Sequence, residues 1–70
     1  MSKIRDRDYT NSEFIYLLIE HIHNEKHRMI LKYRFVDGYT FEQIAEKVDL
    51  STQRVKTIVY KAEQKLIKYL

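Results

Sequence analysis

The 70-residue chain contains no cysteine, no proline and no tryptophan, and its only glycine is Gly38. The absence of cysteine excludes disulfides, thiol catalysis and cysteine-ligated zinc, and it fits a reducing compartment. The absence of proline, with a single glycine, leaves few residues that interrupt regular secondary structure. These absences favour a protein made of helices and few sharp turns.

Long apolar stretches are also absent. The longest uninterrupted apolar run is "FIYLLI", residues 14–19, whereas a membrane-spanning helix needs about 20 apolar residues. The opening "MSKIRDRD" is too acidic for a secretory leader. We therefore expect a cytoplasmic protein that has no membrane partner.

The composition is that of one small folded domain. Charged residues make up 33% of the chain and hydrophobic residues 44%, which is too apolar for a disordered chain. Seventy residues form one domain at most. Because a chain of this length buries only about 60% of its unfolded surface, we expect modest stability as a monomer. Residues 1–9 lack an apolar period, and we expect them to be a flexible tail. Residues 10–70 are expected to form a single domain.

Apolar residues recur at spacings of three and four, which predicts an all-α fold, a small bundle of about four helices. The expected helices run from about Asn11 to Ile22, from near Asn24 to Asp37, from Phe41 to Val48, and from Ser51 toward the C-terminus. The expected inward residues are Phe14, Leu17, Leu18 and Ile22 in the first helix, Met29, Ile30, Tyr33 and Val36 in the second, and Val55, Ile58, Val59, Ala62, Leu66 and Leu70 in the last.

Polar residues mark the starts of these helices. Thr10 with Glu13, and Thr40 with Gln43, have the spacing of a capping box, in which two side chains satisfy free backbone N–H groups. Ser51 offers a simpler N-cap for the last helix. Gly38 suits the end of the second helix, where the chain must turn left-handed.

The segment "QIAEKVDLSTQRV", residues 43–55, has the pattern of a helix-turn-helix. Ala45 is small enough to let the second helix cross closely over the first. Leu50 lies inside the turn and is expected to fill the space between the helices. Asp49 occupies a position that often needs positive φ, and Asp is among the least unfavourable residues there other than glycine.

The segments "LKYRFVDGYTFEQIAEKV" and "DLSTQRVKTIVYKAEQKL" resemble region 4 of sigma-70-type transcription initiation factors and the small phage and bacterial regulators built on that unit. The resemblance covers about residues 24–70. It implies binding to duplex DNA by a helix-turn-helix, regulation of transcription, and RNA polymerase as a possible partner. Since one module binds DNA with limited affinity, a homodimer is a further possible arrangement.

The resemblance also implies which residues would touch DNA. The expected base-reading residues are Thr52, Gln53, Lys56 and Thr57, early in the second motif helix. Initiation factors that read a promoter tend to have Arg and Glu where this chain has Thr52 and Gln53. The docking mode is expected to persist, with a sequence preference different from the usual promoter.

The chemistry of these side chains agrees with a base-reading role. Gln can pair with adenine, Lys favours the acceptors of guanine, and a Thr methyl group can touch the thymine methyl group. The expected phosphate contacts are Ser51, Arg54 and Lys61, with Tyr60 as a possible additional contact. Lys65 and Lys68 lie about 20 Å along the helix axis from Thr52 and are expected to face solvent or another protein.

Charge supports an anionic partner. Residues 51–70 hold five bases against one acid, whereas residues 37–50 hold four acids against one lysine. A basic C-terminal helix beside an acidic segment is typical of nucleic-acid binding, although a solvated charged face produces the same pattern.

Other chemistry has little support. His23 and His27 are four residues apart, but "HNEKH" lacks the glutamate of the zincin motif. No serine, histidine and acid set and no glycine-rich phosphate loop is evident. We expect no enzyme activity, no metal and no cofactor.

A second hypothesis is a protein-binding adaptor or inhibitor on the same scaffold, directed at RNA polymerase or another host protein. Tyr16, Tyr60 and Tyr69 are expected to be exposed. Tyr16, Ile67 and Tyr69 are candidates for a subunit contact, because tyrosine is favoured at interfaces.

Overall fold

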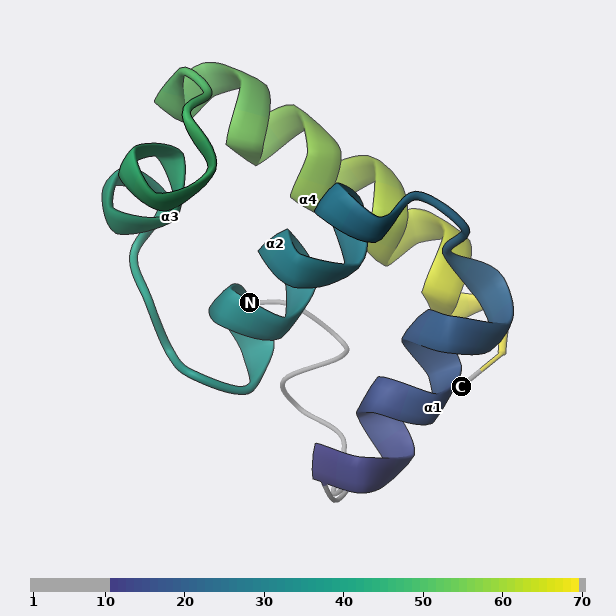
Figure 1. Ribbon diagram of the computed structural model, residues 1–70. Coiled ribbons are helices and arrows are strands. Elements are labelled where there is room, and N and C mark those ends of the chain that lie inside the picture. Colours follow the sequence, from purple (N-terminus) through teal and green to yellow (C-terminus); the bar gives the residue numbers. More distant parts are fainter. Residues whose placement is uncertain (1–10, 70) are drawn as a thin grey trace.

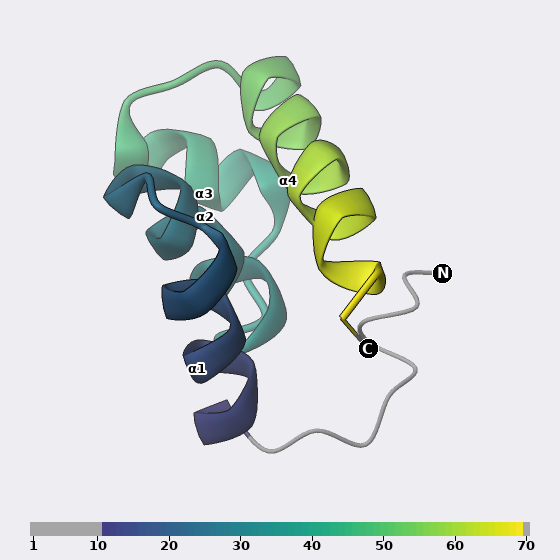
Figure 2. The same cartoon turned by 90° about the vertical axis from the view of Figure 1, so that its right-hand side faces the viewer.

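The computed structural model describes residues 11–69, and this range contains four helices and no strand. The helices are α1 (Asn11–His21), α2 (Glu25–Phe35), α3 (Phe41–Val48) and α4 (Thr52–Ile67). In Figure 1, α3 and the start of α4 lie at one end of the molecule and α1 lies at the other. Figure 2 shows α4 running along one side of the domain. The predicted all-α bundle is confirmed.

All four helices contribute to one apolar core. Ile30, Leu31, Ile44, Val55 and Leu66 are fully buried at its centre. The other members are Phe14, Leu18, Ile22, Ala45, Val48, Ile58, Val59 and Ala62, all of which are buried. At the α1 end, the rings of Phe14 and Phe35 meet edge to face with their centroids 5.5 Å apart. This core fixes the orientation of α4 and hence of its outward face.

The inward face of α2 differs from the prediction. Met29 was expected inside, yet 48% of its surface is exposed, and Leu31 is fully buried instead. The reason is that α2 packs against α1, α3 and α4 together. A helix that is covered on several sides has no single apolar stripe, so its periodicity does not identify the buried side.

The break between α1 and α2 depends on two polar side chains. Asn24 caps α2, because its side-chain oxygen accepts from the backbone N–H of His27 at 3.1 Å. Arg28 reaches back from α2 and donates to the carbonyls of Ile22 and His23. These carbonyls follow the last turn of α1 and have no partner within that helix. The first helix therefore ends at His21, and Ile22 is buried just beyond it.

The turn between α2 and α3 contains Gly38 at φ 76°, the left-handed conformation expected there. Arg34 donates to the carbonyl of Tyr39 at 3.1 Å, which holds the turn against α2. Lys32 and Asp37 form an ion pair of 2.9 Å. Because that pair is largely exposed, it contributes little stability, about 0–1 kcal/mol.

The helix-turn-helix corner has the predicted geometry. Thr40 and Gln43 form a complete capping box at the start of α3. Asp49 adopts φ 57° and ψ 48°, the left-handed conformation, and the N–H of Leu50 donates to the carbonyl of Ala45. Ser51 caps α4 by accepting from the backbone N–H of Arg54 at 3.1 Å.

Some predictions fall outside the described residues. They include the tail at residues 1–9, the Thr10 half of the first capping box, and the inward position of Leu70. Within residues 11–69, no helix is long and apolar enough to cross a bilayer.

Candidate nucleic-acid interface

The outward face of α4 is polar because the opposite face is fully used by the core. Val55, Ile58 and Val59 are buried, which turns Gln53 and Arg54 toward solvent. Ser51 is occupied as the N-cap of the helix. Its hydroxyl oxygen accepts that bond, so its hydroxyl hydrogen remains able to donate to a phosphate.

Gln53 and Thr57 lie one turn apart on this face. Gln53 is exposed, and within residues 11–69 its side-chain amide makes no hydrogen bond, so both its donor and its acceptor are available to a base edge. Thr57 differs, because its hydroxyl donates to the backbone carbonyl of Gln53 at 3.0 Å. Thr57 can therefore offer a base only its oxygen lone pairs and its methyl group. Thr52 is half-buried in the first turn of α4.

One border of this face is a cluster of cations and aromatic rings, consisting of Arg34, Phe41, Lys56 and Tyr60. The guanidinium of Arg34 lies 4.1 Å from the centre of the Phe41 ring, and the ammonium of Lys56 lies 5.8 Å from it. The Tyr60 ring meets Phe41 edge to face at 5.9 Å. Lys56 is half-buried, and Tyr60 is 53% exposed. Cation–π contact restrains Lys56 beside the outward face that contains Gln53 and Thr57.

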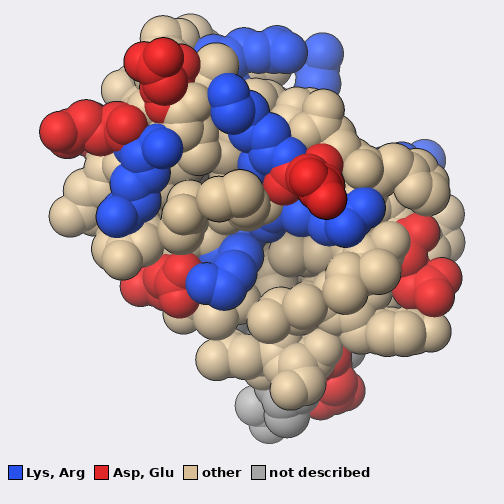
Figure 3. Space-filling model, in the orientation of Figure 1, with Lys and Arg blue, Asp and Glu red and all other residues tan. Residues whose placement is uncertain are grey.

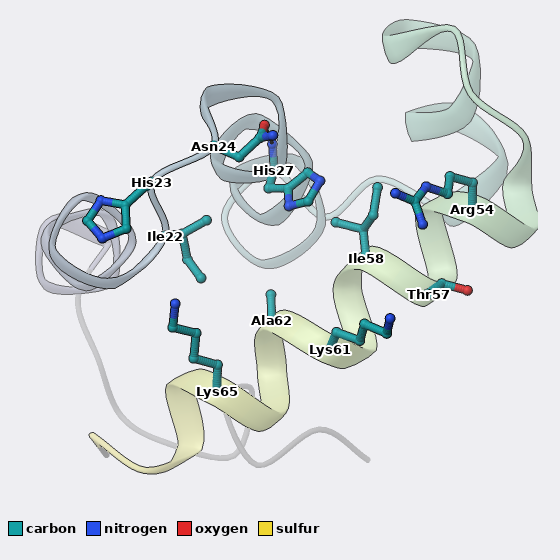
Figure 4. A pocket seen from close by; sticks show the side chains of 10 residues that line it. All are labelled: Ile22, His23, Asn24, His27, Arg54, Thr57, Ile58, Lys61, Ala62 and Lys65. Carbon is teal, nitrogen blue, oxygen red and sulfur yellow. Dashed lines mark hydrogen bonds between the residues drawn. The ribbon is translucent and has the colours of Figure 1, made fainter.

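The other border is a groove of about 400 Å³ between α4 and the start of α2, which we call the α2–α4 groove (Figure 4). Arg54, Thr57, Lys61 and Lys65 of α4 form one wall. The other wall holds the loop between α1 and α2 and the first turn of α2, with His23, Asn24 and His27; Ile22, Ile58 and Ala62 complete the lining. In Figure 4, the guanidinium of Arg54 points toward His27, and Lys65 extends toward the loop.

The charge distribution matches this layout. The only acid of α4 is Glu63, which is absent from the lining of the groove. Burial raises the pKa of the Glu63 carboxyl, and the nearby charge of Arg34 opposes that rise. In Figure 3, Lys and Arg side chains occur over the upper part of the molecule, among some acids, and none is seen over the lower part, where α1 lies. Helix α1 itself contains neither Lys nor Arg.

The family model for sigma-70 region 4 matches residues 24–68, which is most of the described chain. The chain belongs to the sigma-70 region 4 family. Sigma-70 region 4 domains are non-enzymatic helix-turn-helix domains that bind DNA and RNA polymerase. Comparison with curated proteins and with solved structures gave no match. The match begins at the N-cap of α2, so α1 lies outside it.

As a region 4 domain, the chain would present α4 as its recognition helix. The structure brings the predicted base-reading residues Thr52, Gln53, Lys56 and Thr57 together on the first two turns of α4. It places the predicted phosphate residues Arg54 and Lys61 in the α2–α4 groove, and Ser51 at the helix start. Tyr60 lies in the aromatic cluster on the opposite border.

Sequence reasoning missed three contributors to this surface. His27 and Lys65 line the groove, and Arg34 packs on Phe41 beside Lys56. Lys65 was set aside because of its distance along the helix, but the groove runs in the same direction and includes it. The sequence favours His27 as a surface or helix-boundary histidine and gives it no role in DNA contact. Within residues 11–69, no three His, Cys, Asp or Glu side chains gather at a possible metal site.

Proposed function

We propose that this region 4 domain is a sequence-specific duplex DNA-binding regulator of transcription. The observation that carries the proposal is the polar face on the first turns of α4, exposed between two cationic borders. A recognition helix in the major groove has a phosphate strand on each side. The α2–α4 groove and the cluster around Phe41 supply cations for both strands.

In this proposal Gln53 is the central reading residue, with Thr52, Lys56 and Thr57 around it. The free amide of Gln53 favours adenine, through two hydrogen bonds to one base edge. Ser51, Arg54 and Lys61 contact phosphates and set the position of the helix. Since phosphate contacts carry no sequence information, substitutions at the two kinds of position should have different effects.

The test is selection of bound sites from random duplexes, followed by affinity measurements on the selected site and on a scrambled one. Gln53→Ala should cost about 1–3 kcal/mol on the selected site and much less on the scrambled one. Arg54→Ala should weaken binding to both duplexes similarly. An absence of enriched sites, with no loss on Gln53→Ala, would contradict the proposal.

A second candidate function is a protein-binding adaptor that uses the same scaffold. The observation favouring it is the cluster of Arg34, Phe41 and the exposed Tyr60, because Arg and aromatic residues are enriched at protein interfaces. RNA polymerase is the partner that the family suggests. Capture of RNA polymerase that survives nuclease treatment and is lost on Tyr60→Ala would favour this function.

A homodimer would give a single module of this size the affinity that it lacks alone. Tyr16 and Tyr69 are exposed, as predicted, but Tyr69 already stacks on His21 of its own chain, with ring centroids 3.6 Å apart. A dimer therefore remains a prediction, and a palindromic selected site would support it. We also propose that the protein acts in the cytoplasm, where bacterial or phage DNA is transcribed.

A further inference from the structure

The α2–α4 groove contains one feature that base reading does not use, a histidine facing a wall of cations. His27 is half-buried at the first turn of α2, and Arg54 stands opposite it on α4 (Figure 4). The groove continues past Lys61 to Lys65 and His23. No acidic side chain of the described residues lines it.

The remaining charged groups near His27 do not compensate the cations. On its own helix, Glu25 and Lys26 are exposed and outside the groove. Arg28 is directed away, to the carbonyls of Ile22 and His23. Within residues 11–69, the groove therefore has three permanent cations and no acid in its lining, with two histidines on the facing wall.

We propose that this groove seats a backbone phosphate of the bound duplex between His27 and Arg54, and that His27 takes up a proton as the phosphate binds. The inference rests on the proposed DNA-binding function and adds a regulatory property to it, an affinity that responds to pH. The α2–α4 groove adjoins the outward polar face of α4, because Thr57 and Arg54 belong to both surfaces. With α4 in the major groove of DNA, the DNA strand at that border would therefore run along the α2–α4 groove.

The direction of the effect follows from the surroundings of His27. In the free protein, burial lowers the pKa of the His27 imidazole below its usual 6.5, and repulsion from Arg54 lowers it further. A phosphate between the two side chains would attract the imidazolium and offset the charge of Arg54, so the pKa would rise. A group whose pKa rises on binding takes up a proton, and binding then strengthens as pH falls through the bound-state pKa.

The first experiment measures the dissociation constant for the selected duplex from pH 5.5 to pH 8 at constant ionic strength. Affinity should increase toward low pH, by about tenfold per pH unit at most, because one proton is taken up. His27→Gln should abolish the increase, so that the affinity of this variant is the same from pH 5.5 to pH 8. The backbone N–H that bonds Asn24 survives this substitution, so the cap of α2 is retained.

Two matched variants control the first experiment. His21→Gln alters a histidine that stacks on Tyr69 outside the groove, and it should keep the full pH response. His23→Gln alters the other histidine of the groove, and it should keep most of the response. A wild-type affinity that is independent of pH, or a response removed by His23→Gln and retained by His27→Gln, would overturn the inference.

The second experiment needs no variant and reads the proton directly. NMR titration of the histidine side chains in the wild-type protein should show the pKa of His27 rising on addition of duplex. The same titration with sodium sulfate tests whether a free anion has the effect of a DNA strand. The charge of the sulfate ion is constant over this pH range. An unchanged His27 pKa with duplex, or a rise with sulfate and none with duplex, would overturn the phosphate seat.

The two proposals can fail separately. Binding at pH 8, where His27 is neutral in the free protein, tests the DNA-binding function alone. Selected-site binding at pH 8 without any pH response would leave that function intact and remove this inference. A lack of binding at every pH would remove both.

Discussion

Helices α1 and α4 use their inward faces alike and their outward faces differently. Both are amphipathic elements of one core, to which α1 contributes Phe14 and Leu18 and α4 contributes residues such as Val55 and Leu66. Outward, α1 shows tyrosine, isoleucine and acids and has no basic residue except its terminal His21. Outward, α4 shows polar residues and cations. In so small a domain, the core needs apolar residues from every helix, so function is confined to what each helix turns outward.

The largest expected effect tests whether the two inward faces are equivalent. Leu18→Ala in α1 and Leu66→Ala in α4 each remove a buried leucine side chain, so each should lower the free energy of unfolding by about 2–5 kcal/mol. Urea unfolding, monitored by the circular dichroism signal of the helices, measures this free energy. Ile19→Ala is the control, because Ile19 is 55% exposed and its loss should change stability by less than about 0.5 kcal/mol.

If Leu18→Ala left the free energy of unfolding unchanged, the inward faces of α1 and α4 would not be equivalent. That result would mean that α1, which lies outside the family match, packs on the domain without belonging to its cooperative unit.

The next effect tests the difference between the outward faces. Lys61→Ala and Lys65→Ala should each reduce the slope of log affinity against log salt by about 0.9, because each cation that contacts a phosphate releases one counterion. Glu20→Gln on α1 should leave the slope unchanged. Fluorescence anisotropy of a labelled duplex over a salt series measures the slopes. A change of the same size and opposite sign with Glu20→Gln would show that overall charge, and not the α4 face, drives binding.

A smaller effect concerns the cap that starts α4. Ser51→Ala removes the acceptor of the Arg54 N–H and should cost about 1 kcal/mol of stability. Ser51→Asp provides the matched control, because aspartate caps a helix as well as serine does but repels phosphate. It should restore stability and still weaken DNA binding. Thermal unfolding and duplex affinity of the two variants separate capping from phosphate contact.

An effect of similar size concerns Gly38 and Asp49, the two described residues in the left-handed conformation. Asp49→Gly should stabilise the protein by up to about 1 kcal/mol, since glycine adopts φ 57° without a side-chain penalty. Gly38→Ala should destabilise it by about 1–2 kcal/mol through backbone strain alone, because the space around Gly38 is open. Denaturant midpoints measure both changes. An unchanged midpoint with Gly38→Ala would show that the turn before α3 relaxes at no cost.

The sequence alone predicted the local structure well, because local structure depends on neighbouring residues. The bounds of α3, the Thr40–Gln43 box, the Ser51 cap and the left-handed Asp49 all follow from short-range rules, and the structure has each of them. The helix-turn-helix followed from the same segment, and the family match confirms it.

Tertiary structure decided what depends on distant residues. In α2, Leu31 is buried in the core and Met29 is exposed because three other helices pack around α2. His27 and Arg54 are far apart in the chain but face each other across the α2–α4 groove. No periodicity within one helix predicts such a juxtaposition. The sequence by itself determined the bounds of α3, the caps of α3 and α4, and which face of α4 is polar. Only the packing of α2 against α4 decided that this face has a groove beside it, because a groove exists only between elements.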